Sequence, residues 1–87
     1  MATRVTQSVS AVAIRLTEER WAHILRRHPQ LSGREHELPE ALSSADLILE
    51  GDQGTLQAAK RVDRLYLVVI YREISGTDGF VVTAFEA

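Results

Sequence analysis

Cysteine is absent from the 87 residues, so the chain has no disulfide frame, no thiolate nucleophile and no cysteine-based zinc site. Long apolar runs are absent too, because none approaches the ~20 residues that a membrane-spanning helix needs, and the first ten residues lack the apolar core of a secretory signal. Basic charge is not in excess, since the net charge is -2. We therefore expect a cytoplasmic protein outside the membrane, in which any site for a polyanion is local.

Several motifs that carry chemistry are also missing. The sequence has no glycine-rich phosphate loop, no Gly-x-Ser-x-Gly elbow and no carboxylate pair at a convincing spacing. His23 and His28 lie five residues apart with no acidic residue between them, which does not match the spacing of zinc ligands. We expect neither a metal nor a cofactor.

The hydrophobic pattern predicts a single α+β domain. Residues 1–8 are polar and unpatterned and predict a flexible N-terminal tail, so the domain spans residues 9–87. A first strand is expected within 9–16, followed by a helix over 18–28 that Thr17 caps and Pro29 ends. A weaker helix is expected over 35–44.

After residue 45 the apolar period changes from 3.6 to 2. The pattern predicts strands over 46–50, 55–62, 66–73 and 79–86, and the short loops between them imply antiparallel neighbours. The predicted architecture is two N-terminal helices packed on one mainly antiparallel sheet of four to five strands.

The first helix presents two different histidines. Trp21, Ile24, Leu25 and His28 share one stripe of an ideal helix, whereas His23 lies about 140° around it, on the polar side. His28 could therefore sit at the edge of a cleft and act as a general acid or base, since histidine gains and loses a proton near neutral pH. The alternative is that it only complements the negative end of the helix dipole.

His23 has a similar pair of interpretations. It could be a second proton-transfer group, with Arg27 one turn further on to hold a phosphate, or it could belong to a solvated face and contact Glu19.

Two further groups of residues on the predicted strands could take part in a site. Lys60, Arg61 and Arg64 could hold a phosphate, or they could protect an edge strand against aggregation. Tyr71 and Thr83 could donate hydrogen bonds to a phosphoryl oxygen or a leaving group, and both are also good strand formers.

The motif Leu16-Thr17-x-x-x-Trp21-x-His23-Ile24-x-x-Arg27-His28-Pro29, with a Tyr-Leu-Val-Val-Ile strand and a closing Val-Val-Thr-Ala-Phe, carries a family resemblance. Over residues 14–87 the chain resembles the phage and mobile-element nucleases grouped with barnase, EndoU, colicin E5/D and the RelE toxins. The resemblance implies a RelE/barnase-like fold and a toxin-type endoribonuclease that needs no metal and uses the 2′-hydroxyl of RNA as nucleophile.

By this resemblance His28 and His23 are the proton-transfer candidates, with Tyr71 and Thr83 lining the site. The residues that it assigns to phosphate binding are Arg27 and Arg61, beside Lys60. RNA is then the substrate, and an antitoxin or immunity protein is the implied partner. The alternative is an inactive module on the same fold that binds a protein or forms a homodimer, in which an open sheet edge becomes buried.

Overall fold

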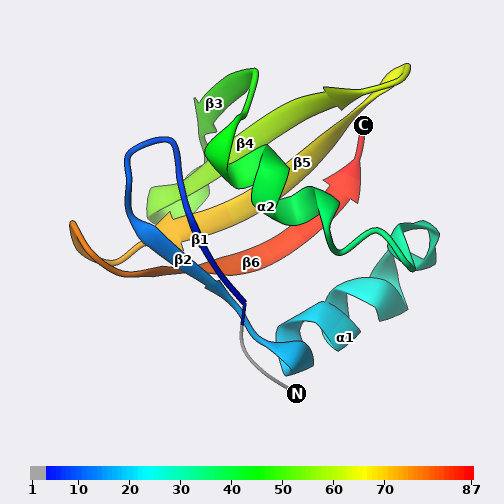
Figure 1. Ribbon diagram of the computed structural model, residues 1–87, viewed down its shortest axis with the longest axis horizontal. Coiled ribbons are helices and arrows are strands. Elements are labelled where there is room, and N and C mark those ends of the chain that lie inside the picture. Colours follow the sequence, from blue (N-terminus) through cyan, green and yellow to red (C-terminus); the bar gives the residue numbers. More distant parts are fainter. Residues whose placement is uncertain (1–3) are drawn as a thin grey trace.

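The computed structural model describes residues 4–87 and contains one six-stranded sheet and two α-helices (Figure 1). The elements along the chain are β1 (Arg4–Gln7), β2 (Ala13–Leu16), α1 (Glu18–Arg27), α2 (Glu37–Ser43), β3 (Leu47–Glu50), β4 (Thr55–Val62), β5 (Leu65–Glu73) and β6 (Gly79–Glu86), with 3₁₀ turns at Pro29–Leu31 and Asp52–Gly54. The strands lie in the order β1-β2-β6-β5-β4-β3. No helix in the described part is long and apolar enough to cross a bilayer.

The sheet differs from the predicted one in size and in direction. The prediction of a mainly antiparallel sheet of four to five strands is wrong, because the sheet has six strands and is mixed, with β2 parallel to β6. Short loops specify pairing only between strands that follow one another, and β2 and β6 lie far apart in the sequence. The antiparallel pairing predicted for the last four strands is confirmed.

β1 falls in the segment that was predicted to be a tail. Residues 1–3 lie outside the described residues, but Arg4–Gln7 form a strand that pairs antiparallel with β2. The strand has little apolar pattern because most of its side chains are exposed, including Val5 at 60%. The turn after it is held by Ser8, whose hydroxyl donates to Glu73 Oε2 at 2.8 Å and accepts from the backbone N–H of Val12. The tail prediction failed because these bonds connect residues distant in sequence.

α1 begins and ends at the residues that the sequence indicated. The Thr17 hydroxyl accepts a hydrogen bond from the N–H of Arg20 at 3.1 Å, and the helix ends at Arg27. His28 is the C-cap residue, with φ −136° and ψ 69°, because a residue before proline is driven out of the α region. β2 pairs with β6 only at Ile14–Gly79 and Arg15–Phe80, and α1 contacts β6 along the remaining edge (Figure 1).

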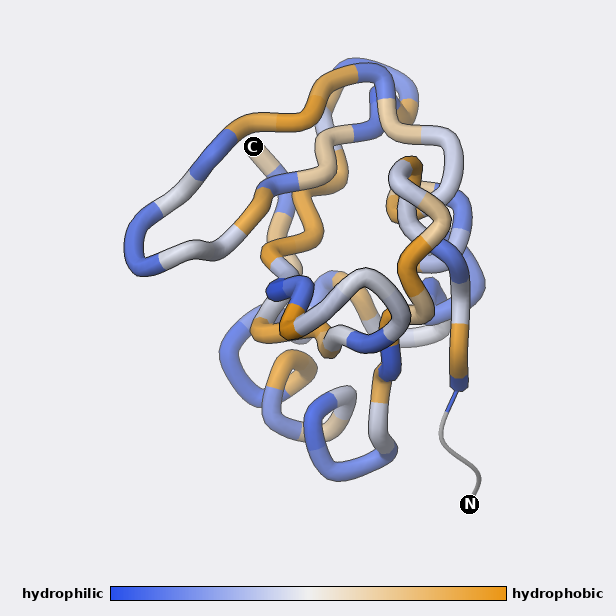
Figure 2. Tube along the Cα trace, turned by 90° about the vertical axis from the view of Figure 1, so that its left-hand side faces the viewer, coloured by the Kyte–Doolittle hydropathy of each residue, from blue (hydrophilic) through white to orange (hydrophobic). Residues whose placement is uncertain are grey.

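The core lies between α2 and one face of the sheet. Its buried side chains include Leu38, Ala41 and Leu42 of α2 and the alternate β5 residues Leu67, Val69 and Tyr71. α2 does not cover the opposite face, which we call the open face, and α1 lies only along its β6 edge. Figure 2 shows the β3–β4 hairpin projecting from the sheet on the side away from α2. A site that uses most of the candidate residues would have to lie on this open face.

Candidate functional site

The strand register determines which side chains share the open face, because directly paired residues point to the same side of a sheet. Two rows cross this face from β6 to β3. The first row is Phe85, Val68, Ala59 and Leu47, and the second is Thr83, Ile70, Gln57 and Leu49. Arg61 pairs with Tyr66 beside the first row, and Arg72 pairs with Phe80 beyond the second. On β4, β5 and β6 the open face therefore carries three aromatic rings and two arginines, and Arg15 of β2, which pairs with Phe80, adds a third arginine.

His28 stands at the β6 edge of the open face. Its ring centroid lies 6.2 Å from that of Phe85, and the two planes are tilted by 36°. The side chain is half-buried, so the ring is held by packing while part of it still reaches solvent. The apolar stripe of α1 thus ends in a ring contact with Phe85, the first residue of a row on the open face.

Thr83 and Tyr71, which were expected to line one site, lie on opposite sides of the sheet. Thr83 pairs with Ile70 on the open face, whereas Tyr71 is fully buried in the core. The Tyr71 hydroxyl has no hydrogen-bond partner among the described residues. Burial, and then the charge of Glu73, raises the pKa of this phenol. Tyr71 is therefore a core residue that cannot reach a ligand on the open face.

His23 lines a cavity that His28 does not border. Its cavity, of about 340 Å³, is bordered by Thr17, Glu19, Arg20 and Arg26. An adjoining cavity of about 330 Å³ shares Thr17 and Arg20 and extends to Arg15 and Phe80 at the edge of the open face. His28 does not border either of these two cavities.

Arg27 is exposed, one helical turn after His23 and two turns after Arg20. This spacing places Arg20 and Arg27 on one flank of α1. Because Arg20 also borders the cavity that contains Phe80, that flank faces the open side of β6. Arginines of α1 thus add positive charge beside the arginines of the open face.

Lys60 and Arg61, predicted as one phosphate-binding cluster, lie on opposite faces of β4. Lys60 Nζ donates to the backbone oxygen of Ser44 at 3.1 Å and so stabilises the C-terminal end of α2. Arg61 stacks on Tyr66, with its guanidinium carbon 5.6 Å from the ring centroid, and its Nε donates to the Asp63 carbonyl. Only Arg61 belongs to the open face, as the alternation of strand residues requires.

The sequence interpretation missed Tyr66 and Arg72 as site residues. The segment Tyr66–Tyr71 is apolar at every position, so its alternation alone does not reveal which residues face away from the core. Phe80 and Phe85 lie on the same face, and Tyr66, paired with Arg61, adds a third aromatic ring to it.

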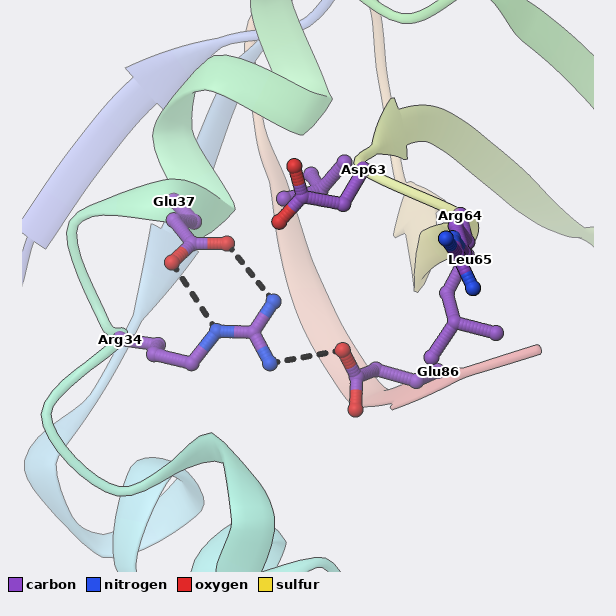
Figure 3. Close-up of a pocket in the computed structure, with 7 residues that line it drawn as sticks. Arg34, Glu37, Asp63, Arg64, Leu65 and Glu86 are labelled. Atoms are coloured by element: carbon purple, nitrogen blue, oxygen red, sulfur yellow. Dashed lines mark hydrogen bonds and ion pairs between the residues drawn. The ribbon is translucent and has the colours of Figure 1, made fainter.

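Another cavity, of about 590 Å³, lies on the side of α2, and an ion-pair cluster forms part of its wall (Figure 3). The Arg34 guanidinium donates to both carboxylate oxygens of Glu37, each at 2.9 Å, and to Glu86 at 2.7 Å. The hydrogen bonds to Glu37 and then to Glu86 raise the pKa of Arg34, and Arg34 lowers the pKa of Glu37. The donors and acceptors satisfy one another, which indicates a structural clamp between α2 and β6.

Within residues 4–87 no group of three or more histidine, aspartate or glutamate side chains is arranged to hold a metal ion. No protein-family model, curated protein or solved structure matches the chain. The function therefore has to be argued from the site itself.

Proposed function

We propose that the open face binds single-stranded RNA and that His28 transfers a proton during metal-independent cleavage of the RNA backbone. The observation that carries this proposal is the contact of His28 with Phe85, because His28 then lies at the edge of a face with half-buried aromatic rings and arginines. The resemblance of the α1 motif to the ribonuclease toxins agrees with this reading.

Binding would rest on stacking and on local positive charge. Tyr66, Phe80 and Phe85 offer ring faces or edges to unpaired bases, and each stacked base contributes about 1–3 kcal/mol. Arg61 and Arg72 lie beside these rings and suit phosphate oxygens. The net charge of -2 is unevenly distributed, since two of the acidic groups, Glu37 and Glu86, lie on the α2 side of the sheet beside Arg34 and away from the open face.

Cleavage follows from one proton acceptor and nearby cations. The neutral His28 ring accepts the proton of the RNA 2′-hydroxyl, whose oxygen attacks phosphorus while the bond to the 5′ oxygen breaks. Solvent at the exposed face protonates the leaving oxygen, and the products are a 2′,3′-cyclic phosphate and a 5′-hydroxyl. Arginine side chains such as Arg27 stabilise the charge that develops on the phosphorane oxygens, and Thr83 is placed to donate a hydrogen bond.

The test uses end-labelled single-stranded RNA in excess EDTA, with a strand of the same sequence lacking 2′-hydroxyls as the second substrate. We expect cleavage of the RNA alone, with 2′,3′-cyclic ends. His28→Asn should slow cleavage by about 100-fold or more, the usual contribution of a general acid or base. Tyr66→Ala should weaken RNA binding while leaving the cleavage rate at saturation much closer to that of the parent protein.

Two histidine variants serve as controls. His36 is exposed beside Glu37 and far from the open face, so His36→Asn should leave cleavage unchanged. His23→Asn should have a much smaller effect than His28→Asn, because His23 lines a separate cavity. A folded protein that binds RNA on this face without cutting any of a set of varied RNAs would refute the enzymatic part, and cleavage that survives His28→Asn would refute the assignment of His28.

A further inference from the structure

β3 leaves one edge of the sheet unprotected. It is the outermost strand, and within residues 4–87 nothing pairs with its outer side. All three of its aliphatic side chains are exposed, Leu47 by 50%, Ile48 by 38% and Leu49 by 51%. Three neighbouring exposed aliphatic residues on a free edge are a ready template for another strand.

The backbone groups that such a strand would use can be identified. The N–H of Gly51 donates to the Thr55 carbonyl, and in an antiparallel ladder inward-bonded residues alternate with outward-facing ones. Leu49 and Leu47 therefore bond toward β4. The N–H and C=O groups of Ile48 and Glu50 point away from the sheet and have no partner among the described residues.

The opposite edge of the sheet, formed by β1, is protected. β1 carries the polar residues Arg4 and Gln7, and α2 packs against it. β3 has no proline, lysine or bulge, the usual features that discourage edge pairing. The β1 edge of the sheet is thus protected by polar side chains and by α2, whereas the β3 edge is open to an incoming chain.

The negative charge around β3 indicates which kind of strand can pair with it. Asp46 and Glu50 flank the aliphatic residues, and Asp52 follows in the turn. A second copy paired antiparallel about Ile48 would set Asp46 of one chain opposite Glu50 of the other, and a like-charge pair opposes association. The Asp46 carboxylate accepts the N–H of Arg61 in β4 at 2.7 Å but keeps its negative charge, so a strand flanked by lysine or arginine would still meet negative charge at both ends of β3.

We propose that β3 captures an extended segment of a different protein, with aliphatic residues at alternate positions and basic residues at both ends. The segment adds a seventh strand, hydrogen-bonded to Ile48 and Glu50. Its side chains beside Leu47 and Leu49 extend the open face, because those two residues belong to the rows that cross it. This proposal does not depend on RNA cleavage.

The test uses the full chain and two synthetic nine-residue peptides of alternating valine and threonine, one with two arginines at each end and one with two glutamates. Backbone amide exchange is followed residue by residue. With nine-tenths of the protein bound to the basic peptide, exchange at Ile48 and Glu50 should slow by about tenfold, because it then proceeds through the free fraction. The acidic peptide should give no protection at the same concentration.

Variants at one position separate strand addition from loss of folding. Ile48→Pro removes an outward N–H that β4 does not use, so the sheet should persist while peptide protection disappears. Ile48→Val keeps that N–H and should retain protection. Equal protection by both peptides, protection that survives Ile48→Pro, no protection by the basic peptide, or a dimer that shields Ile48 and Glu50 without peptide would each overturn the proposal.

Discussion

The Arg34 clamp gives the sharpest test of how this fold is held together. Arg34 lies in the loop before α2 and joins Glu37, in the first turn of that helix, to Glu86 at the end of β6 (Figure 3). Replacing Arg34 by alanine removes three charge-assisted hydrogen bonds and leaves two carboxylates near one another. We expect Arg34→Ala to lower the free energy of unfolding without altering the fold.

The magnitude follows from the exposure of the three side chains, which is 24% for Arg34, 19% for Glu37 and 20% for Glu86. Fully exposed ion pairs contribute about 0–1 kcal/mol, and hydrogen bonds to buried charged groups contribute about 1.5–3 kcal/mol each. This cluster lies between those limits, and water still solvates the carboxylates after the change. The expected loss is about 2 kcal/mol, or a fall in Tm of roughly 10 °C for a domain of this size.

Urea unfolding monitored by the fluorescence of Trp21 measures this loss, since Trp21 is the one tryptophan and packs against the core. Arg64→Ala is the matched control, because Arg64 lines the same cavity without an ion pair to any of residues 4–87 and should change stability by less than about 0.5 kcal/mol. Arg34→Lys keeps the charge but not the planar fork and should fall between the two. If Arg34→Ala costs no more than Arg64→Ala, the cluster is not a clamp.

Three other predictions concern the same fold. Because the Glu37 pKa is held below its ordinary value of 4.5, ionised Glu37 stabilises the protein above that pH, and this stability is lost as the pH falls. The parent protein should therefore lose more stability between about pH 5 and pH 3 than Arg34→Ala does, as urea titrations at each pH would measure. Gly79→Ala should lower the free energy of unfolding by about 3 kcal/mol or prevent folding, since a Cβ there would overlap the Arg72 carbonyl and come within 2.7 Å of Ile14 Cδ1. Gly76→Ala, with open space around it, should be tolerated in the same assay. Tyr71→Phe should leave stability unchanged or raise it by up to about 1 kcal/mol, and it should leave any RNA cleavage unaffected. A large loss of either stability or cleavage would mean that the Tyr71 hydroxyl takes part in the site.

Local chemistry made several features of this protein predictable from its sequence. The hydroxyl of Thr17 and the ring of Pro29 bound α1 through contacts within four residues, and the same proline sets the backbone of His28. The alternating residues of β4 and β6 specified strands, because a period of two is a property of the segment itself.

The candidate site was only partly predictable. His28, Thr83 and Arg61 do lie on or beside one face, but Tyr71 and Lys60 point to the other. For Tyr71 the reason is that β5 is apolar on both sides, so only its packing under α2 decides which residues are buried. A register shift between Ile70 and Tyr71 against β6 further changes the phase along the two strands, and no local pattern marks it.

By itself, then, the sequence determined the ends of α1 to within one residue, the strands after residue 45 and the apolar stripe that ends in His28, whereas α2 is shorter than the predicted 35–44. Tertiary structure alone decided that residues 4–7 form β1, that β2 runs parallel to β6, that His28 packs on Phe85 while His23 lines a cavity on α1, and that Arg34 reaches Glu86. The division has one physical cause. Capping, proline geometry and alternation act within a few residues, whereas pairing between distant strands depends on the burial that the whole chain achieves together.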